Sequence, residues 1–147
     1  MSLQEQLKSE LKTSMLAKDK VRVGTIRLLM AEIKQKEVDT RTELSDDEIL
    51  AVLTKMVKQR KDSISQFAAA GRQDLVDVES AEIQILQAFL PQPLSEAEID
   101  ALIEHAVTQL SVTSMQEMGK VMNALRPQLQ GRADMGDVSA KIKARLA

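Results

Sequence analysis

The chain has 147 residues, enough for one domain or two small ones, and it contains no cysteine, which excludes disulfides, thiolate zinc sites and cysteine nucleophiles. Its longest unbroken apolar run, residues 49–53, is far shorter than the ~18 residues that indicate a membrane span. The first residues mix acids and bases without the apolar segment of a signal peptide. We therefore expect a soluble, cytoplasmic protein that does not enter membranes.

Helix-forming residues dominate the composition. Ala, Leu, Glu, Lys, Gln and Met are abundant, and Trp and Tyr are absent. No window alternates apolar and polar residues for long enough to indicate a strand. The expected fold is all-α, with a core of aliphatic and Met side chains.

Four helices are predicted in the N-terminal part of the chain. Apolar residues recur at helical spacing over residues 2–18 and 20–38. The capping box SDDE, which begins at Ser45, opens a long third helix, and Gly71 is a suitable stop for it. A fourth helix is predicted over residues 73–90.

The clearest boundary in the chain is the PQP motif from Pro91 to Pro93. Two prolines at this spacing cannot lie inside a helix, because each lacks the backbone N–H and restricts the residue before it. The motif divides the chain into an N-terminal four-helix domain, residues 1–92, and a small C-terminal three-helix domain, residues 93–147.

Three further helices are predicted after this boundary. Capping boxes at Ser95 and Ser114 open the fifth and sixth helices. Gly131 follows the sixth helix, and Asp134 or Asp137 caps a seventh helix that runs to the end of the chain.

The sequence carries no residue pattern typical of catalysis. It has no phosphate-binding loop, dinucleotide fingerprint or paired-histidine zinc motif, so we assign no catalytic residue, metal or cofactor. The single histidine, His105, falls opposite the apolar face of its helix and is interpreted as a surface residue. The acidic run Asp46-Asp47-Glu48 starts a helix, where the helix dipole accounts for it without a bound cation.

Two arginines fall on or near apolar helix faces. Arg60 lies within the apolar stripe of the third helix, and Arg22 lies close to that of the second. An unpaired buried charge is too costly, so each should either extend to solvent or meet a carboxylate. We predict that Arg60 forms a structural ion pair with Glu79 and Glu82 on the next helix, with ligand binding as the alternative.

Charge is distributed unevenly along a chain whose net charge is −2. Residues 73–118 carry nine carboxylates and no Lys or Arg, whereas residues 119–147 carry six cations and two carboxylates. Backbone amides at the glycine turns among these cations could accept phosphate. The alternative is an ordinary solvated basic surface, because no aromatic platform for stacking bases accompanies the cations. The predicted nucleic-acid contacts are Lys120, Arg126, Arg132, Lys141 and Arg145.

Two glycines of this region, Gly119 and Gly131, have structural roles predicted from their positions relative to the sixth helix. The sixth predicted helix carries an apolar stripe that consists of Met115, Met118, Met122 and Leu125. We assign this stripe to the core, and the alternative is an adaptable groove that binds a partner. Gly119 borders the stripe, and we expect another helix to approach closely there. Gly131 is expected to form the turn that presents Arg132.

Three stretches of the chain resemble the YqeY family. These stretches are KQRKDSISQFAAAGRQDL (58–75), ILQAFLPQPLSEAEI (85–99) and MGKVMNALRPQLQGRAD (118–134). The resemblance covers essentially the whole chain in order. It implies an all-helical fold in which an N-terminal helical domain precedes a three-helix GatB/YqeY-like domain. That domain is similar to the tail of the B subunit of glutamyl-tRNA(Gln)/aspartyl-tRNA(Asn) amidotransferase, where a similar GKVM segment lies in the part that helps hold tRNA.

The resemblance implies a tRNA- or RNA-binding accessory role and an association with carbon–nitrogen ligase activity that uses glutamine as the amide donor. The catalytic body of the amidotransferase lies outside the shared tail, so we expect that this chain does not catalyse amide transfer alone. One alternative is a protein-interaction module that docks on a tRNA-modifying or translation-associated enzyme through apolar helix faces, and another is a subunit of an amide-transfer complex. Neither DNA nor a membrane is an expected partner.

Overall fold

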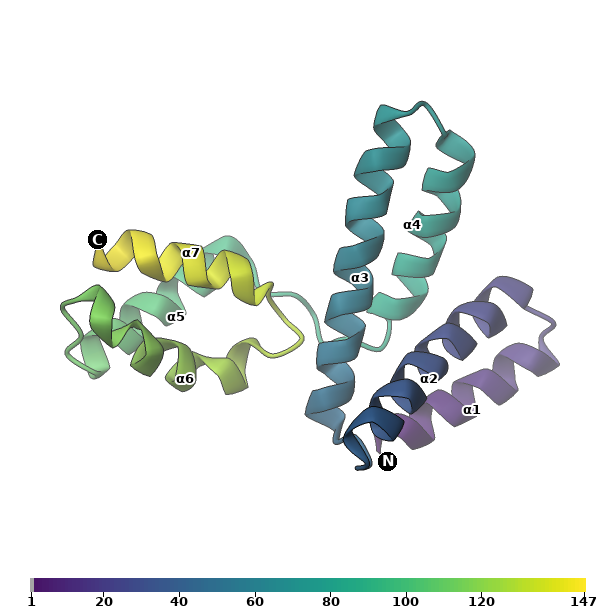
Figure 1. Cartoon of the computed structure of the whole chain (residues 1–147), viewed down its shortest axis with the longest axis horizontal. Helices are drawn as coiled ribbons and strands as arrows, with labels where there is room; N and C mark the ends of the chain where they lie inside the picture. The colour runs from purple at the N-terminus through teal and green to yellow at the C-terminus, as the bar shows by residue number, and fades with distance from the viewer. Residues whose placement is uncertain (1) are drawn as a thin grey trace. The chain divides into compact units, whose positions relative to one another are not determined.

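The computed structural model describes residues 2–147, and every regular element among them is a helix (Figure 1). In chain order the elements are α1 (Leu3–Leu16), α2 (Lys20–Thr40), α3 (Asp46–Ala69), α4 (Gln73–Gln87), α5 (Glu96–Gln109), the 3-10 turn η1 (Met115–Glu117), α6 (Met118–Leu129) and α7 (Met135–Leu146). The all-α prediction is confirmed. Within the described range, none of these helices combines the length and apolar character that crossing a bilayer requires.

The helices form two compact units, each with its own hydrophobic core. The first extends to Leu90 and contains α1 to α4, and the second is Pro91–Ala147 and contains α5 to α7. The division falls at the PQP motif, two residues before the boundary that the sequence suggests.

The first unit consists of two antiparallel helix hairpins, α1–α2 and α3–α4 (Figure 1). The α3–α4 hairpin turns at Gly71, whose φ of +73° is a left-handed conformation that favours glycine. The core lies where the hairpins meet, and each helix contributes a fully buried leucine to it: Leu7, Leu29, Leu53 and Leu86.

The second unit packs α5, α6 and α7 around a small aliphatic core. Its fully buried side chains are Val121, Leu125, Leu129, Val138 and Ile142. Gly131 adopts a φ of +75° in the turn between α6 and α7. Of the two candidate caps for the last helix, Asp134 is the one that acts, because its Oδ1 accepts from the backbone N–H groups of Gly136 and Asp137.

The capping boxes at Ser45 and Ser95 are present, but the one predicted at Ser114 is wrong. At Ser45 and Ser95 the hydroxyl accepts from the backbone N–H three residues later, and the glutamate there accepts from the cap's own N–H. The side chain of Ser114 makes no such bond. The N–H of Glu117 instead donates to the Ser114 carbonyl oxygen and closes a 3-10 turn, so α6 begins at Met118.

The close approach predicted at Gly119 is also wrong. Gly119 is exposed, and a Cβ added to it would meet no atom within 4 Å. The core face of α6 passes through Val121 and Leu125, and the η1 turn takes Met115 out of line with that face. Met115 is therefore 46% exposed, whereas Met118 and Met122 pack partly against the core.

Candidate nucleic-acid interface

Two of the five predicted phosphate contacts, Lys141 and Arg145, lie on α7 and face a row of acids on α5. Arg145 holds Glu104 with two hydrogen bonds, Nε to Oε2 at 2.6 Å and Nη2 to Oε1 at 2.8 Å. Lys141 Nζ donates to Asp100 Oδ1 at 2.8 Å and lies 3.9 Å from Glu96 Oε2. Acids at four-residue spacing on one helix thus meet cations at the same spacing on the other.

These contacts change the protonation equilibria of the groups involved. The Arg145 hydrogen bonds lower the pKa of Glu104, and the bond to Asp100 raises the pKa of Lys141. The cation-rich end of the chain and the acids of α5 therefore neutralise each other within one folded unit. Residues 91–147 together carry six cations and seven carboxylates.

The other three predicted contacts occupy different surroundings. Arg132 Nε donates to the carbonyl oxygen of Gln92 at 3.0 Å, and the Arg132 carbonyl accepts from Leu94 N–H at 2.9 Å, so this residue joins the α6–α7 turn to the segment before α5. Lys120 Nζ lies 3.5 Å from Glu117 Oε2. Arg126 is exposed on α6 and makes no ion pair with the described residues. The phosphate role of these residues stays a prediction.

Arg60 lies in the α3–α4 interface of the first unit, against both carboxylates suggested for it. Its Nε is 2.7 Å from Glu82 Oε2 and 3.8 Å from Glu79 Oε2, and its Nη1 donates to the Met56 carbonyl oxygen at 3.3 Å. The Arg60 side chain is only 15% exposed. This geometry holds two adjacent helices in register.

The remaining polar residues singled out in the sequence have structural surroundings. Arg22 Nη2 lies 3.0 Å from Glu10 Oε2, which links α2 to α1. Asp46 Oδ1 accepts from the N–H of Leu3, which ties the start of α3 to the start of α1. His105 is exposed. Among the described residues, no three His, Cys, Asp or Glu side chains come together as metal ligands.

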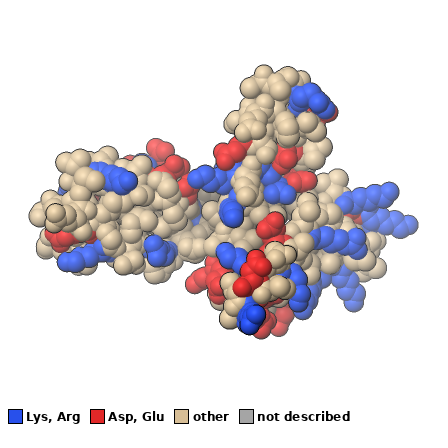
Figure 2. Space-filling model, in the orientation of Figure 1, with Lys and Arg blue, Asp and Glu red and all other residues tan. Residues whose placement is uncertain are grey.

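A cationic groove between α1 and α2 was missed by the sequence reasoning. Its rim carries Lys8 from α1 with Arg27 and Lys34 from α2, and its floor includes Leu7 and Ile33. The groove has a volume of about 520 Å³. The three cations are exposed and form no ion pair with any described residue. Lys and Arg side chains gather on this part of the molecule, over α1 and α2 (Figure 2).

A sequence signal for this groove exists. Arg27 and Lys34 are seven residues apart on α2, so these two cations lie within about 20° of one another around the helix axis. Counting charge by segment hides this row, because α2 also carries acids.

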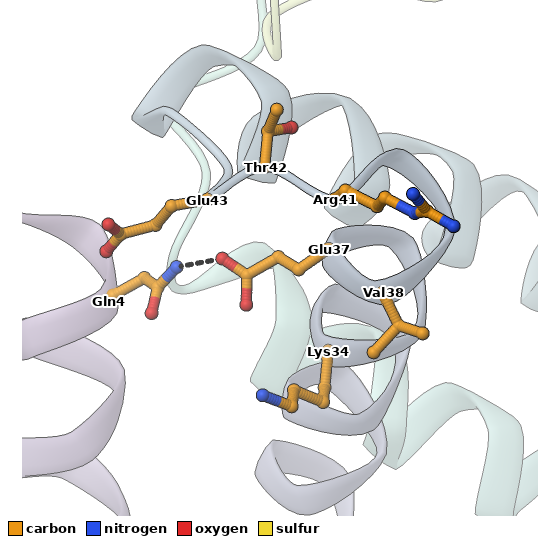
Figure 3. Close-up of a pocket in the computed structure, with 7 residues that line it drawn as sticks. All are labelled: Gln4, Lys34, Glu37, Val38, Arg41, Thr42 and Glu43. Atoms are coloured by element: carbon orange, nitrogen blue, oxygen red, sulfur yellow. Dashed lines mark hydrogen bonds between the residues drawn. The ribbon is translucent and has the colours of Figure 1, made fainter.

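One carboxylate, that of Glu37, lies at the end of this groove, and its hydrogen bonds hold it away from the groove's cations. Gln4 Nε2 and the N–H of Leu44 both donate to Glu37 Oε2 at 3.0 Å, and Figure 3 shows Gln4 and Glu37 meeting between the helices. The Leu44 and Gln4 hydrogen bonds, with the nearby charges of Lys34 and Lys8, lower the pKa of Glu37. This carboxylate is satisfied by neutral donors, so it forms no close ion pair with either lysine.

A family model described as "Yqey-like protein" matches residues 4–146. The chain belongs to the YqeY-like family. This match confirms the family resemblance, and it covers both units of the fold.

Curated relatives of this YqeY-like chain include proteins named "Altered inheritance of mitochondria protein 41, mitochondrial". The relative from Lachancea thermotolerans is 46% identical over 107 residues, which are 71% of this chain and 57% of the relative. The Kluyveromyces lactis relative is 40% identical over 78% of this chain and 66% of its own length. The Pyrenophora tritici-repentis relative is 32% identical over 93% of this chain and 77% of its own length. This YqeY-like chain thus spans less than two thirds of the first two relatives.

The names of these relatives overturn one expectation from the sequence. They are mitochondrial proteins by name, so the cytoplasmic location expected for this YqeY-like chain is wrong. The expectation rested on the lack of cysteine and of a long apolar run. Neither feature distinguishes one reducing aqueous compartment from another.

Proposed function

We propose that this YqeY-like chain is an RNA-binding accessory protein, with tRNA as the first candidate ligand, and that it is not catalytic alone. The resemblance of its second unit to the tRNA-holding tail of the amidotransferase B subunit supports tRNA. The cationic groove of the first unit is the observation that carries the proposal, because it supplies the charge that binding to a phosphate backbone needs.

The groove is a better phosphate site than the α7 cations for an electrostatic reason. Arg145 would have to give up its two hydrogen bonds to Glu104, or share them, before it bound a phosphate. Lys8, Arg27 and Lys34 form no such hydrogen bonds within the described chain, so they have fewer direct contacts to give up before they bind phosphate oxygens. The main RNA contact is therefore assigned to α1 and α2, and of the predicted contacts in the second unit Arg126 is the one with no ion pair among the described residues.

The aromatic content of the chain indicates which kind of RNA would bind. Phe67 and Phe89 are the only aromatic residues besides His105, and Phe89 is buried in the first core. No aromatic ring lines the groove, so recognition there would rest on the shape and phosphates of a structured RNA and not on stacking with single-stranded bases. A folded tRNA presents such a backbone.

A mobility-shift titration with total tRNA over a salt series tests the proposal. Three phosphate contacts give a slope of log affinity against log salt of roughly −3, or about a 40-fold loss between ~50 and ~200 mM salt. The test variant carries Lys8→Gln, Arg27→Gln and Lys34→Gln, and the matched control carries Lys141→Gln and Arg145→Gln. The test variant should lose most binding and most of the salt dependence, whereas the control should retain both.

The outcomes separate the two surfaces. Loss of binding in the control variant alone would move the site to the second unit, which contains all five contacts predicted from the sequence. No tRNA binding by the native chain at ~50 mM salt would refute the RNA-binding role itself. Far-UV circular dichroism of both variants verifies that each remains folded.

The association with carbon–nitrogen ligase chemistry has its own test. Purified chain is incubated with glutamyl-tRNA, ATP and glutamine, and the aminoacyl group is analysed after hydrolysis. We expect no glutaminyl-tRNA, because the resemblance extends only to the tail and not to the catalytic body. Conversion by the chain alone would refute the non-catalytic assignment.

A further inference from the structure

A second groove in the first unit is apolar and lies between α2 and α4. It has a volume of about 640 Å³. Its α2 wall includes Val21 and Leu28, and its α4 wall includes Val78. These side chains are 56%, 48% and 55% exposed, so three of the large exposed hydrophobic residues of the chain line one groove. Exposed aliphatic side chains that gather in one groove, instead of being scattered singly, mark a candidate interaction surface.

Opposite charges stand on the two walls of this groove. Lys20 precedes Val21 on the α2 wall, and Asp77 precedes Val78 on the α4 wall. Lys20 forms no ion pair with the described residues, and Asp77 Oδ1 accepts only from the Gln73 amide at 2.8 Å. The α2 wall therefore offers a cation beside aliphatic side chains, and the α4 wall offers the carboxylates of Asp77 and Glu82 beside Val78, so the two walls complement each other.

We propose that this groove is a self-association surface whose occupant is a second copy of the chain. A two-fold axis through the groove exchanges its walls, which places Lys20 of each copy against Asp77 of the other and stacks Val21 on Val78. One surface thus supplies both halves of a closed dimer. An unrelated partner would not require opposite charges to be matched on the two walls.

The α2 wall of the groove leaves room for the second copy of the chain. Gly24 lies on the α2 wall, and a Cβ added there would meet no atom within 4 Å. The end of α1 extends the apolar surface in sequence just before α2, because Met15 is 51% and Leu16 is 77% exposed. The exposed patch is small for a stable dimer, so the expected association is weak, with a dissociation constant in the micromolar range or above.

Gly24 supplies the first test because its substitution blocks the groove without removing a native contact. Gly24→Leu fills the open space and improves helix propensity, so the chain should fold at least as well. Gly119→Leu is the matched control, since Gly119 also faces open space but lies on α6. Sedimentation velocity over a concentration series should show a dimer for the native chain and the control. Gly24→Leu should weaken dimerisation at least ~10-fold.

Charge exchange then identifies the occupant. Lys20→Asp and Asp77→Lys should each be monomeric, because like charges then face each other across the axis. An equimolar mixture of the two variants should form a heterodimer, since both of its contacts pair Asp with Lys. A native chain that stays monomeric at every concentration tested overturns the proposal. This holds even if the groove is then found to bind another protein. A dimer that survives Gly24→Leu, or a mixture that stays monomeric, also overturns it. The proposal does not depend on RNA binding.

Discussion

Replacing Arg60 by methionine removes the cation that holds Glu82 and Glu79 at the α3–α4 interface. Removing one partner of a fully buried pair costs about 3–5 kcal/mol, and one hydrogen bond to a charged group contributes about 1.5–3 kcal/mol. The Arg60 and Glu82 side chains retain 15% and 19% exposure, so solvent recovers part of the loss. We therefore expect Arg60→Met to lower the free energy of unfolding of the first unit by about 2 kcal/mol.

Thermal unfolding followed by far-UV circular dichroism measures this effect. For a unit of this size, a loss of about 2 kcal/mol lowers the midpoint by roughly 10 °C. The double variant Arg60→Met with Glu82→Met should be less destabilised than the sum of the two single variants, because it leaves fewer carboxylates without a cation. Arg72→Met is a control, since its pair with Asp74 is exposed and its midpoint should hardly change.

Two results would refute this reasoning. Arg60→Met could unfold at the native midpoint, or the double variant could lose as much stability as the two single variants together. If Arg60→Met folds normally and loses only tRNA binding, then Arg60 contacts a ligand.

Three further predictions concern helix ends and protonation. Ser95→Ala should cost about 1 kcal/mol in urea unfolding, whereas Ser114→Ala should cost little, because only Ser95 caps a helix with its hydroxyl. Equal losses would contradict this. Gly119→Ala should raise the thermal midpoint, since alanine loses less conformational entropy than glycine in a helix and meets open space there, and a lower midpoint would restore the close-packing interpretation. Arg145 lowers the pKa of folded Glu104, so the stability from this pair is complete above about pH 4.5 and is lost as pH falls through the lower folded value. Glu104→Gln should therefore differ from the native chain in unfolding midpoint near pH 7, and this difference should shrink as the pH falls below about 4.5. A difference that does not change with pH would contradict this.

Local signals were sufficient for most of the fold. Ser45 and Ser95 open helices because a capping box depends on residues three apart, and Gly71 ends α3 because its left-handed conformation favours glycine. Ser114 shows the limit of this reasoning. Its residue pattern is the same, but a backbone 3-10 turn satisfies the N–H that its hydroxyl would accept from.

Charge was harder to interpret because compensation occurs over long separations. Arg145 and Glu104 are 41 residues apart, and only the packing of α5 with α7 brings them together. A count by segment therefore treated the end of the chain as an open basic surface. Arg60 and Glu82 were easier to pair, because they lie on consecutive helices of one hairpin. The groove cations needed both the spacing along α2 and the position of α1, and the second of these is not a local property.

The salt dependence of tRNA binding is the most direct test of the proposed function. The native chain should bind tRNA at ~50 mM salt with a slope of roughly −3, and the variant with Lys8, Arg27 and Lys34 changed to Gln should bind weakly with a slope near zero. A native chain that does not bind, or whose affinity is independent of salt, would contradict the RNA-binding role.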